Sequence, residues 1–117
     1  LWGMGIVSES QAAFSLNFKQ RIERAKERMV VEDVRFDVNQ DKVYVYVRNI
    51  GAITITIDHV YVNHNLAEIV GGPIKLDMGK GTIIEVNSPI AIESGETYVI
   101  TVATTRGKTV SGYWIAP

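Results

Sequence analysis

The sequence of 117 residues contains no cysteine. The missing thiols exclude disulfide bonds, cysteine-ligated zinc sites and cysteine nucleophiles, so the fold must rest on packing and hydrogen bonds. Histidine is almost as scarce, because His59 and His64 are the only two. Their spacing is not the i, i+4 helical spacing of a metalloprotease motif, and a metal site that combines them with Asp58 is disfavoured. We predict no metal and no cofactor.

Motifs that carry catalysis are also missing. No serine stands in a Gly-x-Ser-x-Gly elbow, and the carboxylates are scattered among turns without forming an acid and base pair. The glycines at residues 71–72 and 79–81 lack the spacing of a phosphate-binding loop and a helix to follow, so we interpret them as turn glycines. The formal net charge of −1 gives no general attraction to nucleic acid. The sequence predicts a protein that is not an enzyme.

No long hydrophobic run is present either. The chain begins with the short apolar run LWGMGIV, whereas a helix needs about 20 apolar residues to cross a bilayer. We interpret this run as the end of a longer membrane-anchoring segment upstream of Leu1 that has been removed. The alternative is an ordinary hydrophobic terminus in which Trp2, Met4 and Ile6 pack on the folded domain.

The stretch around which the chain is organised is VYVYVRNIGAITITIDHVYVN, residues 43–63. Valine occupies alternate positions over residues 43–47, and isoleucine does so over residues 53–57. This is the period-two pattern of strands with one buried face. Between the two runs, Asn49 and Gly51 tolerate the positive φ values that a tight connection often needs. The pattern predicts a β-hairpin.

The second of these strands contains a fault in its alternation. After Ile57 the apolar positions resume at Val60, so one extra residue is present near Asp58 and His59. Either a β-bulge restores burial at this point, or one strand ends at Asp58 and another begins at Val60. In both cases residues 63–65 form a turn.

Residues 8–29 predict one long amphipathic helix, because no proline or glycine interrupts them and apolar residues recur at helical spacing. The apolar stripe contains Phe14, Phe18 and Ile22, and continues to Met29. Five basic residues lie between positions 19 and 28. They form either a solvated face or a contact with an anionic lipid or an acidic partner. Because the stripe begins several turns before the sheet, we expect its own domain to bury it incompletely.

Short alternating segments separated by turn residues follow to the C-terminus. We expect strands near residues 34–38, 66–70, 74–76, 83–86, 98–102 and 110–115, in addition to the two of the hairpin. The fold class is therefore mainly β, with an N-terminal amphipathic helix followed by an antiparallel β-sandwich, or a related barrel, of about seven or eight strands. The predicted domains are a helical stalk over residues 1–29 and a β-sandwich over residues 30–117.

Two stretches and the overall layout carry a resemblance to a known family. The stretches are VYVYVRNIGAITITIDHVYVN and GETYVITVATTRGKTVSGYW, and the layout is an amphipathic helix that runs directly into a β-domain from an apolar N-terminus. The chain resembles the archaeal type IV pilin-like surface proteins, the group that includes adhesive pilins, archaellins and archaellum stator components. The resemblance implies a β-sandwich outside the cell and a hydrophobic N-terminal helix held in the membrane or in a filament core.

The resemblance also implies a function in protein–protein assembly. We expect a non-catalytic, extracytoplasmic filament subunit that acts in adhesion or motility, or alternatively a membrane-anchored archaellum stator component that binds an envelope (S-layer) protein. Its location would be extracellular or pseudoperiplasmic, and it would assemble with further copies through the N-terminal helix or with the envelope protein. A soluble ligand-binding β-sandwich that uses its tyrosines is a less favoured class. The predicted assembly interface consists of Phe14, Leu16, Phe18, Ile22, Tyr44 and Tyr46.

Overall fold

The computed structural model describes residues 26–117, and eight strands lie in this range. Their bounds are β1 Met29–Asp37, β2 Lys42–Asn49, β3 Ile55–Val62, β4 Asn65–Ile69, β5 Ile74–Leu76, β6 Gly81–Asn87, β7 Thr97–Thr104 and β8 Thr109–Ile115. The mainly β class and the number of strands agree with the sequence prediction. Most of the predicted helix lies outside the described residues, together with Phe14, Leu16, Phe18 and Ile22 of the predicted interface.

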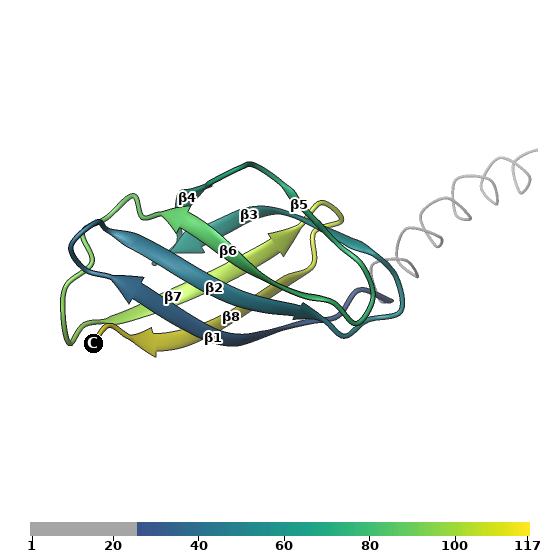
Figure 1. Ribbon diagram of the computed structural model, residues 1–117, viewed down its shortest axis with the longest axis horizontal. Helices are drawn as coiled ribbons and strands as arrows, with labels where there is room; N and C mark the ends of the chain where they lie inside the picture. The colour runs from purple at the N-terminus through teal and green to yellow at the C-terminus, as the bar shows by residue number, and fades with distance from the viewer. Residues whose placement is uncertain (1–25) are drawn as a thin grey trace, which may run out of the picture.

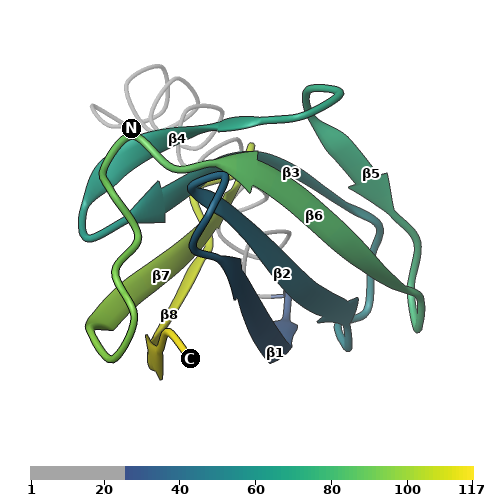
Figure 2. The same ribbon diagram turned by 60° about the vertical axis from the view of Figure 1, so that its left-hand side comes forward.

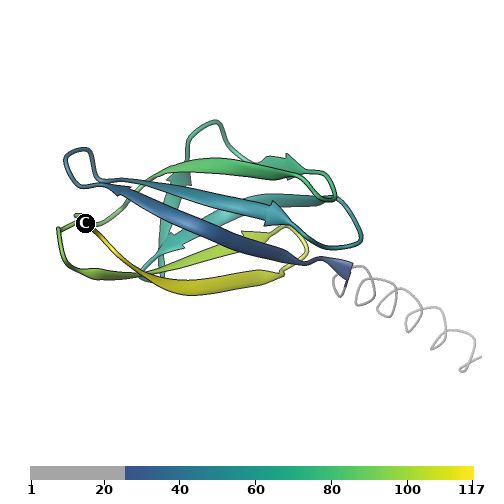
Figure 3. The ribbon, with the colours of Figure 1, turned by 60° about the horizontal axis from the view of Figure 1, so that its bottom comes forward.

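All strand pairs are antiparallel, and they join into one continuous sheet in the order β1-β2-β6-β4-β3-β7-β8, with β5 beside β3 (Figure 1). β4 pairs with β6 on one side and with β3 on the other, so it connects the two halves of the sheet. The sheet curls until its two ends, β1 and β8, come into contact (Figures 2 and 3). The result is a nearly closed, barrel-like antiparallel sheet.

The interior of this sheet is filled by aliphatic side chains from the inward positions of the strands. Branched side chains suit these positions because they favour strand geometry and pack well on a pleated surface. The fully buried members are Val43, Val45, Val47, Ile84 and Val86 from β2 and β6, and Ile55, Ile57, Val60, Val62, Ile100 and Val102 from β3 and β7. Burial of each such side chain contributes about 1.5–3 kcal/mol, so this interior is the main source of stability.

β2 and β3 do not form the hairpin that the sequence predicted. β2 pairs with β1 and β6, whereas β3 pairs with β4, β5 and β7. The connection at residues 50–54 carries the chain from one half of the sheet to the other, so the valines of β2 and the isoleucines of β3 enter one core from different halves. Alternation specifies which face of a strand is buried, and it is compatible with either arrangement.

The β-bulge predicted near Asp58 is confirmed. Ile57 of β3 lies opposite Thr104 of β7. The next pair is His59 opposite Ala103, which leaves Asp58 as the extra residue in the ladder. β3 continues through this point without a break, so the alternative of two separate strands is wrong. The bulge returns the valines that follow it to the core.

The turn predicted at residues 63–65 is also confirmed. Asn63 and His64 connect β3 to β4 with φ values of 49° and 68°. Two successive residues with positive φ are typical of a tight hairpin whose twist matches that of the strands. The side chain of Asn63 adds a contact to the neighbouring strand, because its Oδ1 accepts a hydrogen bond from the Val99 N–H at 2.8 Å.

The start of the first strand differs from the prediction. The sequence placed Met29 in the last turn of the helix, but Met29 is the first residue of β1, pairs with Asn49 of β2 and is buried in the core. Glu27 and Arg28 are already non-helical. Burial inside the sheet outweighs the helix propensity of methionine, which is a weak effect beside tertiary packing.

The bulge makes one deletion within a strand tolerable. Removing Asp58 leaves regular alternation through β3, so we expect that variant to keep a cooperative unfolding transition. Removing Thr101 instead would invert one flank of β7, whose pairing with β8 is regular. Each buried aliphatic side chain that turns outward loses about 1.5–3 kcal/mol of stabilisation, so we expect that variant not to fold. Urea denaturation followed by circular dichroism measures both. If the Asp58 deletion also abolished folding, β3 would require the bend that the bulge introduces, and not only the alternation of buried residues that it restores.

Candidate functional site

Residues 26–28 lead the chain into β1 and lie against the connection between β2 and β3. The Ile50 N–H donates to the carbonyl oxygen of Arg28, and the Ala52 N–H donates to that of Lys26, both at 2.9 Å. These bonds hold the segment beside residues 50–52 in the manner of a short strand pair. The direction in which the chain approaches β1 is therefore set by the sheet.

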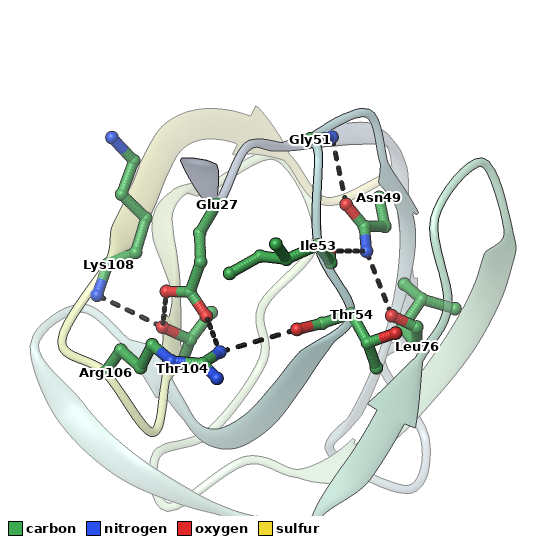
Figure 4. A network of polar contacts seen from close by, with 9 residues as sticks. All are labelled: Glu27, Asn49, Gly51, Ile53, Thr54, Leu76, Thr104, Arg106 and Lys108. Atoms are coloured by element: carbon green, nitrogen blue, oxygen red, sulfur yellow. Dashed lines mark hydrogen bonds and ion pairs between the residues drawn. The ribbon is translucent and has the colours of Figure 1, made fainter. Parts of the chain in front are cut away.

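Glu27 is a fully buried carboxylate within this segment. Thr104 Oγ1 donates to Glu27 Oε1 at 2.8 Å, and Arg106 Nη1 donates to Glu27 Oε2 at 3.0 Å (Figure 4). The Lys108 N–H in turn donates to Thr104 Oγ1 at 3.1 Å. Burial of a charge is costly unless the charge is paired and hydrogen-bonded. The arrangement satisfies both oxygens and ties the incoming chain to the turn between β7 and β8.

Asn49, at the end of β2, shapes the other side of the same junction. Its buried side chain donates through Nδ2 to the carbonyl oxygens of Ile53 and Leu76, each at 2.9 Å. Its Oδ1 accepts a hydrogen bond from the Gly51 N–H at 3.0 Å (Figure 4). Both donor positions and the acceptor of the amide are used, so its burial leaves no polar group unsatisfied. The amide fixes the path of the connection that receives residues 26–28.

Gly51 is where this connection approaches residues 26–28 most closely. A Cβ atom at this position would collide with the carbonyl oxygen of Lys26 and with the backbone nitrogen of Arg28. Backbone atoms cannot move aside as the end of a side chain can, so only glycine allows the approach. We call the residues that hold the segment the junction clamp: Glu27, Asn49, Gly51, Thr104 and Arg106.

The junction clamp connects distant parts of the chain. It joins residues 26–28 to two connections that are far apart in the sequence, the one after β2 and the one after β7. Residues 26–28 are therefore held by both of these connections as well as by the start of β1. The polar residues buried in the described part of the chain are Glu27, Asn49 and Thr104, and all three belong to the clamp.

Tyr44 and Tyr46 are the described members of the predicted interface, and both lie half-buried on the outward face of β2. Tyr44 has Arg35 and Glu85 as its neighbours across the two ladders. The Arg35 guanidinium lies 5.8 Å from the centre of the Tyr46 ring, a cation–π distance. The structure places the two tyrosines together on a charged surface. Their association with the helix stripe stays a prediction, because the stripe lies outside the described residues.

Ion pairs surround these tyrosines. Lys42 Nζ lies 3.0 Å from Glu85 Oε2, and Arg48 Nε lies 3.3 Å from Glu32 Oε2. The hydrogen bond to Glu85, with the attraction of the same carboxylate, raises the pKa of Lys42 above its ordinary value of 10.5. The outward face of β1, β2 and β6 is therefore a surface whose charges are paired with one another.

Asp58 and His59 form a close pair at the bulge, with 2.9 Å between Asp58 Oδ1 and His59 Nδ1. Within residues 26–117, no group of three or more His, Asp or Glu side chains is placed to hold a metal ion. A pair alone does not supply the coordination of a protein metal site. The same part of the chain contains no helix long and apolar enough to cross a membrane.

Comparison with known protein families and with curated protein sequences found no match. Solved structures do share the fold. The archaellum periplasmic stator protein FlaG from Sulfolobus acidocaldarius is similar with a TM-score of 0.56 and 18% identity, over 75% of this chain and 99% of that protein. The complex of FlaF and FlaG from the same organism gives a TM-score of 0.56 and 18% identity, over 74% of this chain and 87% of the matched chain.

A third similar structure is the archaeal flagellum of Methanospirillum hungatei strain JF1. Its matched chain has a TM-score of 0.72 and 12% identity, and the similarity covers 98% of this chain and 79% of that one. At these levels of identity the likeness concerns the fold. The stator protein FlaG and the flagellum chain are therefore similar to this chain in fold.

Sequence reasoning missed the junction clamp. Glu27 lies in the range predicted to be helical and Arg106 lies between two predicted strands, and neither position carries a motif that predicts a site. Glu27 and Thr104 are separated by 77 positions, so no local pattern connects them. Gly51 was assigned correctly to a connection, but its close approach to residues 26–28 depends on how that connection crosses between the halves of the sheet.

Truncation of Arg106 should cost more stability than neutralisation of Glu27. Arg106→Ala leaves a buried carboxylate without its cation, and because the arginine side chain is 40% exposed the expected loss is about 2–4 kcal/mol, below that of a fully buried pair. Glu27→Gln keeps an acceptor for Thr104 and leaves an arginine that water can reach. We therefore expect the free energy of unfolding to fall by only about 1–2 kcal/mol. Urea unfolding compares the two variants, with exposed Lys75→Ala as the control. Equal losses would show that the buried charge is not the reason Arg106 is needed.

A methyl group at position 51 should loosen the junction. Gly51→Ala forces the backbone of residues 50–52 away from that of residues 26–28. We expect the free energy of unfolding to fall by about 1–3 kcal/mol and hydrogen exchange at the Ile50 and Ala52 amides to become faster. Gly81→Ala is the matched control, since a Cβ atom there would meet chiefly the movable guanidinium of Arg48, at 3.1 Å. Amide exchange measured by NMR tests the contact directly. Exchange at both amides as slow as in the parent protein would contradict it.

Proposed function

We propose that this chain is a non-catalytic, extracytoplasmic component of an archaellum or a related archaeal pilin-like filament, and that it acts through protein–protein assembly. The observation that carries the proposal is the fold, because its nearly closed antiparallel sheet is similar to a periplasmic stator protein and to a flagellum chain. Both of these proteins have structural roles by name. The proposed location is the cell surface or the pseudoperiplasm, and the two halves of the sheet would serve as the layers of the family's β-sandwich.

The proposed domain organisation is a helical stalk that carries a β-domain, and the boundary predicted between residues 29 and 30 moves to before Glu27, because Glu27 and Arg28 are non-helical and Met29 begins β1. The junction clamp supports this organisation, because it fastens the chain immediately before Met29 to connections from both halves of the sheet. A flexible linker would let the β-domain reorient freely. A clamped junction instead makes the position of the β-domain follow that of the stalk, as assembly into a regular structure requires.

Between the two archaellum roles, we place the filament subunit first. The reason is the predicted apolar stripe of the N-terminal helix, which further copies in a filament would cover. The alternative is a membrane-anchored stator component that binds an envelope (S-layer) protein. The two roles differ in the partner of the helix stripe, which is either further copies in a repeating, non-closing contact or one dedicated protein.

The proposed contacts are those of the helix stripe and of the outward face of β2. Burial of one phenylalanine side chain contributes about 1.5–3 kcal/mol, so Phe14 and Phe18, with Ile22 and the adjacent Leu16, would suffice to associate parallel helices. Tyr44 and Tyr46 would form a second contact, in which the surrounding ion pairs provide a polar rim. Attachment to the membrane would come from a segment upstream of Leu1.

Charged residues in the stripe should abolish assembly. We expect the purified full-length protein to form filaments visible by negative-stain microscopy, and we expect the double variant Phe14→Glu and Phe18→Glu to sediment as a small species, because an unpaired carboxylate cannot be buried between helices. The matched control is Phe14→Leu with Phe18→Leu, which keeps the stripe apolar and should assemble.

Two other outcomes are informative. A parent protein that remains a monomer or a dimer at high concentration would favour the stator role over the filament. Glutamate variants that assemble as well as the parent would contradict the stripe in either role.

A further inference from the structure

Except for the one between β4 and β5, the connections between strands lie at one of two ends of the sheet, because neighbouring strands are antiparallel. The junction clamp lies at the end toward which the arrowheads of β2 and β7 point, and the C-terminus lies at the opposite end (Figure 1). We call them the clamped end and the far end. The segments of the clamped end are residues 26–28, 50–54, 77–80 and 105–108. Those of the far end are residues 38–41, 63–64 and 88–96.

The clamped end is basic. Its segments contain five Lys or Arg residues against two carboxylates. One carboxylate, Glu27, is buried and paired with Arg106. The other, Asp77, accepts a hydrogen bond from the Thr54 hydroxyl at 3.2 Å. The other four basic residues form no ion pair with another residue of the described range, and they are Lys26, Arg28, Lys80 and Lys108.

The far end is acidic. Its segments contain three carboxylates and neither Lys nor Arg. Asp41 Oδ1 accepts a hydrogen bond from the Ile92 N–H at 2.8 Å. Glu93 and Glu96 are exposed, and within residues 26–117 they form no ion pair. The two ends of the domain therefore carry opposite charge, and the charged groups of both are available to a partner.

The connection that carries Glu93 and Glu96 is held in place by hydrogen bonds. The Glu93 N–H donates to the Tyr98 hydroxyl at 2.7 Å. The Gly95 N–H donates to the carbonyl oxygen of Ala116 at 2.8 Å, and the Ala116 N–H donates to that of Glu96 at 2.9 Å. A surface fixed in this way loses little conformational entropy when it binds.

The clamped end also presents apolar surface beside its charges. Ile50 is 49% exposed and Met78 is 56% exposed. Residues 77–80 lie along one side of the end of β2, where the Gly79 N–H donates to the carbonyl oxygen of Asn49 at 2.8 Å. β1 and the chain that enters it lie on the other side of β2. Residues 77–80 are therefore open to a partner without obstruction by residues 26–28.

We propose that the clamped end of one copy of this chain binds the far end of a second copy, so that copies associate head to tail. Two clamped ends repel each other, as do two far ends, whereas unlike ends attract, so the charges fix the orientation of the contact. A second copy is favoured over an unrelated acidic protein because the chain itself carries the complementary surface, with Glu93 and Glu96 on a fixed connection. The contact is heterologous and leaves an unfilled end on each oligomer, so it continues beyond the dimer.

An anionic membrane is the other kind of surface that a basic end attracts. The helix predicted from residue 8 to the clamp would be about 30 Å long, whereas the attraction between exposed charges fades over about 8 Å at physiological salt. An anchor at the start of that helix would leave the clamped end too far from the lipid headgroups. This step rests on the stalk of the proposed function, but the opposite charge of the two ends does not depend on it.

The head-to-tail contact uses neither the helix stripe nor the outward face of β2. Phe14→Gln with Phe18→Gln disables the stripe without adding charge, so association that persists in this background belongs to the two ends. Loss of filaments without loss of this association would count against the proposed function alone. Filaments without any contribution from the ends would count against the head-to-tail contact alone.

Sedimentation velocity of the full chain in this background tests the contact without a change at either end. We expect concentration-dependent oligomers at about 50 mM salt, and a dissociation constant about tenfold higher or more at about 500 mM, because salt screens the charges. A chain that stays monomeric at low salt, or whose association does not respond to salt, would overturn the proposal. A monomer that instead sediments with vesicles of equal parts phosphatidylcholine and phosphatidylglycerol would assign the clamped end to lipid and overturn it as well.

Charge reversal identifies the occupant as a second copy. One variant carries Glu93→Lys with Glu96→Lys, and the other carries Arg28→Glu with Lys80→Glu. Each variant alone places like charges across the contact, so we expect its dissociation constant to rise about tenfold or more. In an equimolar mixture each clamped end meets a far end of opposite charge on the other variant, so association should return.

The matched control is His59→Lys with Ser111→Lys, which adds two lysines at exposed positions on β3 and β8 that belong to neither end. It should associate as the parent does. Circular dichroism verifies that the charge-reversed variants are folded, and the salt dependence of the parent remains decisive if one of them is not. A mixture of folded variants that stays as dissociated as each variant alone would refute the head-to-tail contact.

Discussion

The inward alternation of branched aliphatic residues is the constraint on which the rest of this structure depends. β2 and β6 supply it from one half of the sheet, and β3 and β7 supply it from the other. Since the sheet nearly closes on itself, each long strand has one face in this single interior and one face outside. The bulge at Asp58 is a consequence of the constraint, because it is the means by which β3 keeps both of its ends in the core. Any function must then be placed on the outer faces, at the edges or at the ends.

The buried polar residues of the described structure gather where residues 26–28 join the sheet. They are Glu27, Asn49 and Thr104. Buried ion pairs and amides add little net stability compared with apolar packing, but they are geometrically demanding. Their concentration at the junction is consistent with a requirement for one defined direction of the incoming chain. This requirement is the link between the fold and the proposed role in assembly.

The outer surface of the sheet has two faces that differ in charge. The face of β1, β2 and β6 carries paired charges around Tyr44 and Tyr46, whereas the outer face of β7 and β8 carries hydroxyl, aromatic and aliphatic groups. A charged, self-paired face is well solvated and makes specific contacts only with a complementary partner. An uncharged face has a lower cost of desolvation. The two faces thus differ in charge and in the cost of their desolvation, while the clamped end contacts residues 26–28.

The sequence by itself determined where most of the strands lie, which of their faces enters the core, the turn at Asn63 and the extra residue near Asp58. These properties follow from the chemistry of adjacent residues, since alternation and turn preference act over a few positions. The structure decided that the extra residue forms a bulge within one strand. The tertiary structure decided which strands are neighbours, so β2 and β3 lie in different halves instead of forming a hairpin. It also moved Met29 from the predicted helix into β1, because Asn49 and the core receive it there. The contact of Glu27 with Thr104 and Arg106 could not be predicted from the sequence, because it also depends on which strands are neighbours. A buried carboxylate is tolerated only where distant donors converge on it, and that convergence exists only after the sheet has closed.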